Sequence, residues 1–63
     1  MILFCDDELF NIELESRSIR SAVREAKDRF RIIGRVRRTG HYGNIFEYKL
    51  VGSDYGFTLR QIN

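Results

Sequence analysis

Five basic residues in the middle of the chain recur at spacings that fit one side of a helix. At about 100° per residue, their side chains would lie within a sector of about 80°. Like charges three or four residues apart cost a helix roughly 0.2–0.5 kcal/mol per pair, so such a row favours an anionic neighbour. Phosphates of a nucleic acid are one candidate, because the planar guanidinium of arginine binds them through two parallel hydrogen bonds. The five residues are Arg17, Arg20, Arg24, Lys27 and Arg31.

The sequence leaves two other interpretations of this row open. Residues 1–15 hold five acidic residues and no basic one, whereas residues 16–38 hold nine basic residues and two acidic ones. The acidic segment could neutralise the basic row, within one molecule or across a dimer. Alternatively, the row is a solvated helix face with ordinary (i, i+4) ion pairs, which would be Arg24–Asp28 and Glu25–Arg29.

A second candidate site follows in residues 34–44, a segment rich in arginine and glycine. Its basic, histidine and tyrosine side chains could combine phosphate contacts with stacking on a base, as proteins that bind single strands do. The alternative is a flexible, solvated hairpin tip. The string Gly40-His41-Tyr42-Gly43 matches the GxxG loop of KH domains, but strand-like residues flank it here, so we reject that match. The candidate residues are Arg35, Arg37, Arg38, His41 and Tyr42.

Catalysis and metal binding find little support in the sequence. His41 is the only histidine, and Cys5, the only cysteine, lies in an apolar run typical of a core position. No Walker motif, dinucleotide-binding glycine pattern or HExxH sequence is present. The acidic residues 6–8 are typical of a solvated turn. We therefore predict a protein that is not an enzyme and has no metal or other cofactor.

Length and composition predict a single small domain over residues 1–63. With 43% hydrophobic and 32% charged residues, the chain is too apolar for a disordered tail, and no apolar run is long enough to span a membrane. Residues 1–5 lack a basic leader, so we expect no signal peptide. A single cysteine forms no internal disulfide, which favours a reducing, cytoplasmic setting.

Hydrophobic periodicity predicts the elements that would position the candidate residues. Apolar side chains at i, i+3, i+4, i+7 and i+11 from Ile19 predict an amphipathic helix at about 18–30, with Ser16 or Ser18 as its N-cap. The predicted fold is α+β in the order β-β-α-β-β-β, with the helix across an antiparallel sheet. Strands are expected at residues 2–5, 10–15, 31–38, 45–51 and 57–62, with loops at 39–44 and 52–56.

Charged side chains on the outer face of this sheet alternate in sign, which predicts pairing between neighbouring strands. Proline is absent, so nothing in the sequence blocks an edge strand from pairing with another chain, and a homodimer through an edge strand is possible. The alternating residues are Glu13, Glu15, Arg35, Arg37, Glu47, Lys49 and Arg60.

About half of the chain resembles the recognition helix and wing of winged-helix DNA-binding proteins. The resemblance is carried by residues 18–26 (SIRSAVREA), 32–33 (II), 37–40 (RRTG) and 48–50 (YKL). It implies a DNA-binding regulator. That family has at least one more helix where residues 1–15 predict strands, so a helix at 6–14 would favour this interpretation.

The order of elements over most of the chain is similar to that of some small phage-encoded anti-CRISPR proteins. Residues 12–16 (IELES), the alanine-containing helix and three strands with spaced aromatic residues carry the similarity. Those proteins bind a host ribonucleoprotein complex, often through lysines or arginines that occupy its nucleic-acid path. The resemblance implies a phage or mobile-element inhibitor in the host cytoplasm, and it assigns no role to an individual residue.

Together these observations predict a small non-enzymatic protein that engages nucleic acid or a nucleoprotein complex through the basic helix face and the hairpin. No membrane partner is expected. Two alternatives remain: a winged-helix-like DNA-binding regulator, and a dimeric protein-interaction module with no nucleic-acid role. A salt titration separates nucleic-acid binding from the protein-interaction module, because phosphate contacts make binding fall steeply with ionic strength.

Overall fold

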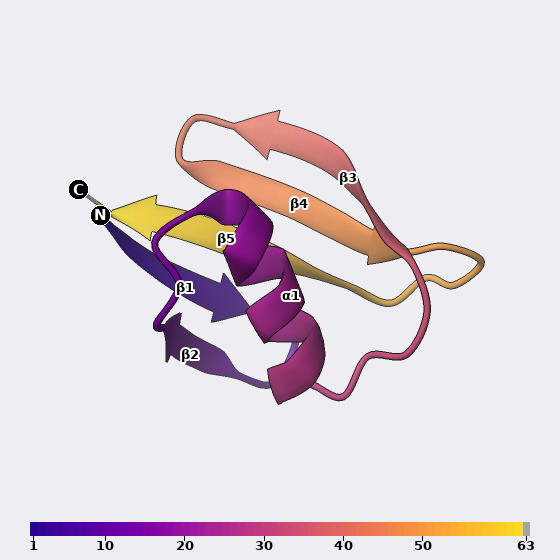
Figure 1. Cartoon of the computed structure of the whole chain (residues 1–63). Coiled ribbons are helices and arrows are strands. Elements are labelled where there is room, and N and C mark those ends of the chain that lie inside the picture. The colour runs from indigo at the N-terminus through magenta and orange to yellow at the C-terminus, as the bar shows by residue number, and fades with distance from the viewer. Residues whose placement is uncertain (63) are drawn as a thin grey trace.

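Within residues 1–62, which the computed structural model describes, the chain forms one helix and an antiparallel sheet of five strands. The predicted α+β class and the order of elements are confirmed. No helix in this range is long and apolar enough to cross a membrane. The elements are β1 (Ile2–Asp6), β2 (Asn11–Leu14), α1 (Ile19–Arg29), β3 (Val36–Tyr42), β4 (Ile45–Leu50) and β5 (Gly56–Ile62) (Figure 1).

The helix crosses the sheet because the strands before and after it lie at opposite edges. The strand order is β2-β1-β5-β4-β3, and all neighbours are antiparallel. From the β2 edge the chain passes through α1, over one face of the sheet, and then through residues 30–35 to the β3 edge (Figure 1). The predicted edge-strand homodimer would therefore have to form through β2 or β3.

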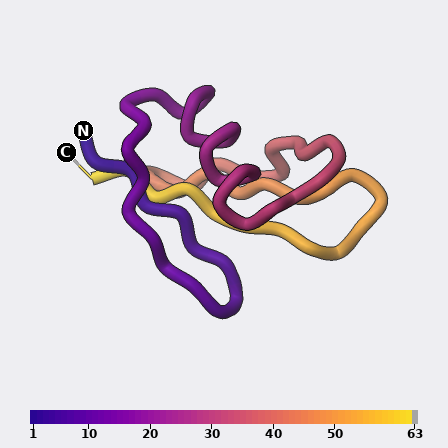
Figure 2. Tube along the Cα trace, turned by 60° about the horizontal axis from the view of Figure 1, so that its bottom comes forward, coloured from indigo at the N-terminus to yellow at the C-terminus, as the bar shows by residue number. Residues whose placement is uncertain are grey.

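The core lies between α1 and the face of the sheet that the helix covers (Figure 2). Cys5, Leu59 and Phe46 are neighbours across β1, β5 and β4 on this face. The prediction that Cys5 is a core residue is confirmed, since its side chain has 0% exposure. The helix contributes two small, fully buried residues one turn apart, which allow it to approach the sheet closely. The buried residues are Leu3, Cys5, Leu14, Ala22, Ala26, Tyr48, Phe57 and Leu59.

Local capping sets the two ends of α1. The Ser18 hydroxyl accepts a hydrogen bond from the backbone N–H of Ser21 at 3.2 Å, so Ser18 is the N-cap that the sequence offered as one of two choices. At the other end Arg31 adopts φ 54°, a left-handed conformation that a right-handed helix cannot include. The helix therefore spans 11 residues and is slightly shorter than the predicted range.

The prediction of a strand at residues 31–38 is wrong in its boundaries. β3 begins only at Val36 and continues to Tyr42, through most of the predicted loop. Residues 31–35 turn the chain, because Arg31 has φ 54° and Gly34 has φ 115°. The side chain of Ile33 in this turn is 91% exposed, so its apolar character does not mark a strand.

The β3–β4 hairpin needs only two loop residues, 43 and 44, where the sequence predicts six. Tyr42 and Ile45 pair directly on either side of the turn. Gly43 has φ 60° at the first loop position, where type II′ hairpin turns take glycine. A tight turn thus replaces the expected flexible tip.

A bulge at Thr39 decides which β3 side chains share a face of the sheet. Arg38 pairs with Tyr48 and Gly40 with Glu47, so Thr39 is an extra residue in the register. The bulge places Arg38 and His41 on the helix face, although strict alternation would separate them.

Candidate anion-binding groove

Three basic residues of α1 line a groove between the helix and the start of β3. Arg20, Arg24 and Lys27 are spaced at i, i+4 and i+7, which places them on one side of the helix. The turn at residues 31–35 brings Arg35 to the same groove, which has a volume of about 490 Å³. We call this hollow, lined by the four cations Arg20, Arg24, Lys27 and Arg35, the helix groove.

The floor of the helix groove is apolar. Val23, Ile32 and Val36 line it and also pack against the core. Asp28 is the acidic residue among those that line the groove. Cations above an apolar floor suit a ligand that combines negative charge with flat, weakly polar parts, as a nucleotide does.

No carboxylate pairs with the four cations of the helix groove in the part of the chain that the structure describes. The ion pairs found there are Arg29–Glu25 at 3.5 Å and Arg60–Asp6 at 3.3 Å. The acidic segment 1–15 contributes one carboxylate to these pairs, and that carboxylate lies next to β5 instead of the groove. Among residues 1–62, no ion pair with the acidic segment therefore neutralises the basic row.

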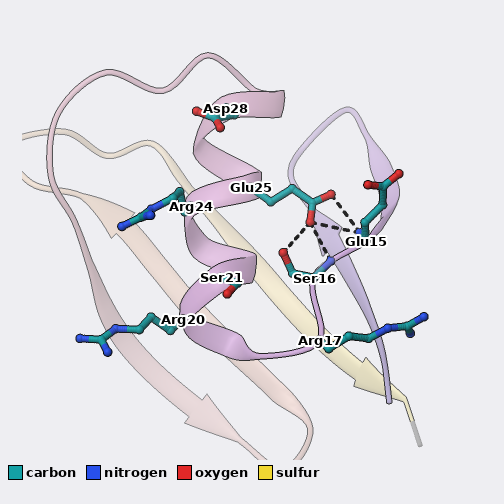
Figure 3. Close-up of a pocket in the computed structure, with 8 residues that line it drawn as sticks. All are labelled: Glu15, Ser16, Arg17, Arg20, Ser21, Arg24, Glu25 and Asp28. Carbon is teal, nitrogen blue, oxygen red and sulfur yellow. Dashed lines mark hydrogen bonds between the residues drawn. The ribbon is translucent and has the colours of Figure 1, made fainter.

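The hydrogen bonds of Glu25 hold α1 against the chain that follows β2 (Figure 3). Its carboxylate accepts the backbone N–H of Glu15 at 3.0 and 3.1 Å, and both the N–H and the hydroxyl of Ser16 at 2.9 and 2.7 Å. Burial raises the pKa of Glu25, but these hydrogen bonds and the Arg29 guanidinium outweigh burial, so the pKa lies below its ordinary value. Arg20 and Arg24 point to the other side of the helix (Figure 3).

A second hollow lies on the side of α1 drawn in Figure 3, towards residues 15–17. Its charges balance, because three acidic residues line it beside three basic ones. A balanced lining attracts anions less than the helix groove does, where four bases meet one acid. The charged residues of this second hollow are Glu15, Arg17, Arg20, Arg24, Glu25 and Asp28.

Two members of the predicted basic row, Arg17 and Arg31, lie outside the helix groove. Arg17 precedes the N-cap, and its guanidinium donates a hydrogen bond to the Met1 carbonyl at 3.0 Å. Its side chain points away from Arg20 and Arg24 (Figure 3). Arg31 follows the end of α1 in a left-handed conformation and is absent from the residues that line the helix groove. Periodicity extended the row past both ends of the helix, where the periodicity no longer holds.

The predicted hairpin residues also divide between the two faces of the sheet. Arg38 and His41 lie on the helix face, where the His41 ring stacks on Phe46 with ring centroids 4.1 Å apart. Arg37 and Tyr42 lie on the opposite face, and the Tyr42 side chain is 65% exposed. The hairpin therefore does not present its five candidate residues as one patch.

The predicted pairing of alternating charges on the outer face is largely wrong. Arg37 lies directly opposite Lys49, which is a like-charged pair. Arg60 does bind a carboxylate, that of Asp6, and its guanidinium also covers the Phe4 ring at 4.7 Å. Strand register decides these neighbours, and charge alternation along single strands does not reveal the register.

Cys5 and His41 are too far apart to act together. They lie in one row across the sheet, with Leu59 and Phe46 between them. Three strand spacings of about 4.8 Å separate β1 from β3, or about 14 Å. Burial, and secondarily the charge of nearby Asp6, raises the pKa of the Cys5 thiol to about 12, which keeps it protonated at neutral pH.

Asp7 stabilises the turn that follows β1 through hydrogen bonds of its carboxylate. Asp7 accepts the backbone N–H groups of Leu9 and Phe10 at 2.9 and 2.8 Å, and the Tyr55 hydroxyl donates to it at 3.0 Å. These hydrogen bonds outweigh the effect of burial and lower the pKa of Asp7. Among the described residues, no group of three potential metal ligands lies close enough to hold an ion.

Sequence reasoning missed three contributions to this surface. Strand alternation placed Lys49 on the outer face, but Lys49 was not among the candidate binding residues, because its position beside Arg37 depends on the hairpin register. The apolar floor of the helix groove depends on the turn at residues 31–35, which no periodicity marks. Glu25 was expected only to pair with Arg29, and its hydrogen bonds to residues 15–16 depend on the tertiary fold.

No family model, curated protein or solved structure matches this chain.

Proposed function

We propose that this chain is a non-enzymatic protein that binds the phosphate backbone of nucleic acid, free or within a nucleoprotein complex, through the helix groove. One observation carries the proposal. Four cations from two parts of the chain line one groove, and none of them pairs with a carboxylate within residues 1–62. A cytoplasmic site of action is part of the proposal, since the single cysteine forms no internal disulfide.

The energetics of the helix support an anionic ligand. Arg20, Arg24 and Lys27 repel one another across a single helix face, at roughly 0.2–0.5 kcal/mol per pair. A polyanion that spans the groove would offset this cost and gain affinity from the release of its counterions. Guanidinium groups bind phosphate in a two-pronged manner, which favours phosphate as the anion.

The residues of the helix groove also indicate how far binding would depend on the base sequence of the nucleic acid. Charged contacts to phosphate position a ligand without reading its bases. The floor residues Val23, Ile32 and Val36 offer no hydrogen-bond donor or acceptor from their side chains. The proposal is therefore one of binding with little dependence on base sequence.

Fluorescence anisotropy with labelled oligonucleotides at low salt tests the proposal. R20Q/R24Q should weaken binding about tenfold or more, because it removes two phosphate contacts. R17Q/R31Q is the matched control, since it removes the same charge outside the groove and should change the affinity much less. Equal losses in the two variants, or no binding of DNA or RNA by the wild type, would refute the proposal.

A further inference from the structure

A second cationic hollow lies at the β3 edge, close to the helix groove. Arg35, Arg37 and Lys49 line it, together with Val36, Thr39, Leu50 and residues 51–53. None of these lining residues is acidic. We call this hollow, defined by Arg35, Arg37 and Lys49, the edge hollow. Its volume is about 360 Å³.

Two cations of the edge hollow, Arg37 and Lys49, lie on the side of the sheet that α1 does not cover. Arg37 and Lys49 are direct partners in the β3–β4 register, one residue after Val36 and one before Leu50. Val36 packs against the core on the helix face, so alternation directs Arg37 and Lys49 to the opposite face. Like charges directly opposite each other destabilise a sheet, and neither residue has a carboxylate partner in the described chain.

Arg35 joins the two hollows. It lines both of them, at the point where the chain enters β3. β3 is an edge strand. No further strand within residues 1–62 pairs with it, so a ligand can pass from one face of the sheet to the other around this edge. The cations therefore form a path that begins at α1, passes Arg35 and ends at Lys49 on the opposite face.

Acidic residues limit this path on the opposite face. The neighbouring hollow shares Lys49 and includes uncharged residues of β4 and β5 in its lining, but five carboxylates from β1, its turn, β4 and the loop before β5 also line it. A polyanion would be repelled there, so it would not continue across the sheet. These residues are Asp6, Asp7, Glu8, Glu47 and Asp54.

We propose that the ligand of this surface is a single-stranded nucleic acid that bends around the β3 edge, with phosphates in the helix groove and the edge hollow. The inference rests on the proposed function and makes it more specific. The persistence length of duplex DNA is about 150 base pairs, so a sharp turn around the edge of one sheet costs a duplex far more than it costs a single strand. A duplex would therefore contact the helix groove but not the edge hollow.

The two lysines of the chain provide a direct test in the wild-type protein, because Lys27 lies in the helix groove and Lys49 in the edge hollow. Acetylation by a water-soluble reagent, followed by mass spectrometry, reports on each lysine separately. A single strand of about 16 nucleotides should protect both lysines, and one of about 4 nucleotides only Lys27. A duplex of 16 base pairs should also protect only Lys27.

Affinity measurements with R37Q/K49Q complete the test. The variant should bind the long single strand about tenfold more weakly and the duplex as tightly as the wild type does. The charge-conserving variant R37K/K49R should keep the wild-type affinity. Circular dichroism checks that each variant is folded. If a variant does not fold, the lysine protection still tests the inference, because it uses the wild-type protein.

The outcomes separate this inference from the proposed function. Protection of Lys27 without Lys49 by the long strand, or equal protection of both by the duplex, would overturn the inference and leave the proposed function standing. Loss of duplex affinity in R37Q/K49Q would do the same. No protection of either lysine, and no binding at low salt, would refute both.

Discussion

The carboxylate of Glu25 accepts hydrogen bonds from both the backbone N–H and the hydroxyl of Ser16, at 2.9 and 2.7 Å. Ser16 lies between β2 and α1, so this contact ties the helix to the chain that enters it. The anchor fixes one side of α1 towards the β2 end of the sheet. Arg20 and Arg24 are thereby held on the side that faces β3 and the helix groove.

The variant E25Q should be less stable than the wild type by about 1–3 kcal/mol at pH 7. The N–H groups of Glu15 and Ser16 and the Ser16 hydroxyl would then donate to a neutral amide oxygen in place of a charged carboxylate. The folded pKa of Glu25 is lowered, so its contribution is present above about pH 4.5 and disappears as the pH falls through the folded pKa. Urea unfolding of both proteins at pH 7 and at pH 3 measures this.

The stability difference should therefore shrink at pH 3, and D28N, which alters an exposed carboxylate on the same helix, should differ little from the wild type at either pH. A difference between E25Q and the wild type that stays constant with pH would contradict the proposed anchor.

Cys5 should react only when the protein unfolds. Its side chain is fully buried and its thiol pKa is raised to about 12, so very little thiolate exists at pH 8. Alkylation by iodoacetamide should be slow in buffer and should approach the rate of a free thiol in denaturant. Rapid alkylation of the folded protein would show that Cys5 is accessible, which would contradict the packing described around this residue.

Leu59 should be among the most sensitive core positions, because it lies in the central part of the sheet with 0% exposure. L59A should lower the free energy of unfolding by about 2–5 kcal/mol, which is a large part of the total stability of a domain of this size. The control I33A removes atoms from a side chain that is 91% exposed, so it should change stability by less than about 0.5 kcal/mol. Similar losses in the two variants, measured by urea unfolding, would contradict the described core.

Two glycines should respond differently to the addition of a methyl group. A Cβ at Gly56 would lie 2.5 Å from the backbone carbonyl oxygen of Tyr48, so the strands themselves would have to move. The atoms nearest to a Cβ at Gly40 would belong to the Tyr42 side chain, the first at 2.7 Å, and this exposed side chain can rotate away. G56A should therefore lower the melting temperature more than G40A does, and the reverse order would contradict the β4–β5 register.

Much of the fold could be predicted from local patterns. The apolar spacing from Ile19 predicted the helix, with Ser18 as one of two cap candidates, and the strand patterns predicted β1, β2, β4 and β5 to within a few residues. β3 was displaced because Ile32 and Ile33 are typical of strands, whereas the positive φ of Arg31 and Gly34 turns the chain there. Such backbone conformations depend on tertiary packing.

The candidate site could be predicted only in part. Arg20, Arg24 and Lys27 follow from helical periodicity, but their meeting with Arg35 depends on how the chain returns to the β3 edge. The neighbours Arg37 and Lys49 depend on the hairpin register. The sequence therefore indicated cations that share a helix face, and tertiary structure added those that complete the path.

The salt dependence of single-strand binding tests the central claim most directly, because it counts the phosphates that the protein contacts. The logarithm of the affinity should fall linearly with the logarithm of the salt concentration, at about 0.7 per contacted phosphate. R20Q/R24Q should reduce this slope by about 1.4, and R17Q/R31Q should leave it close to the wild-type value. A slope that both variants reduce equally, or that neither changes, would contradict a binding site in the helix groove.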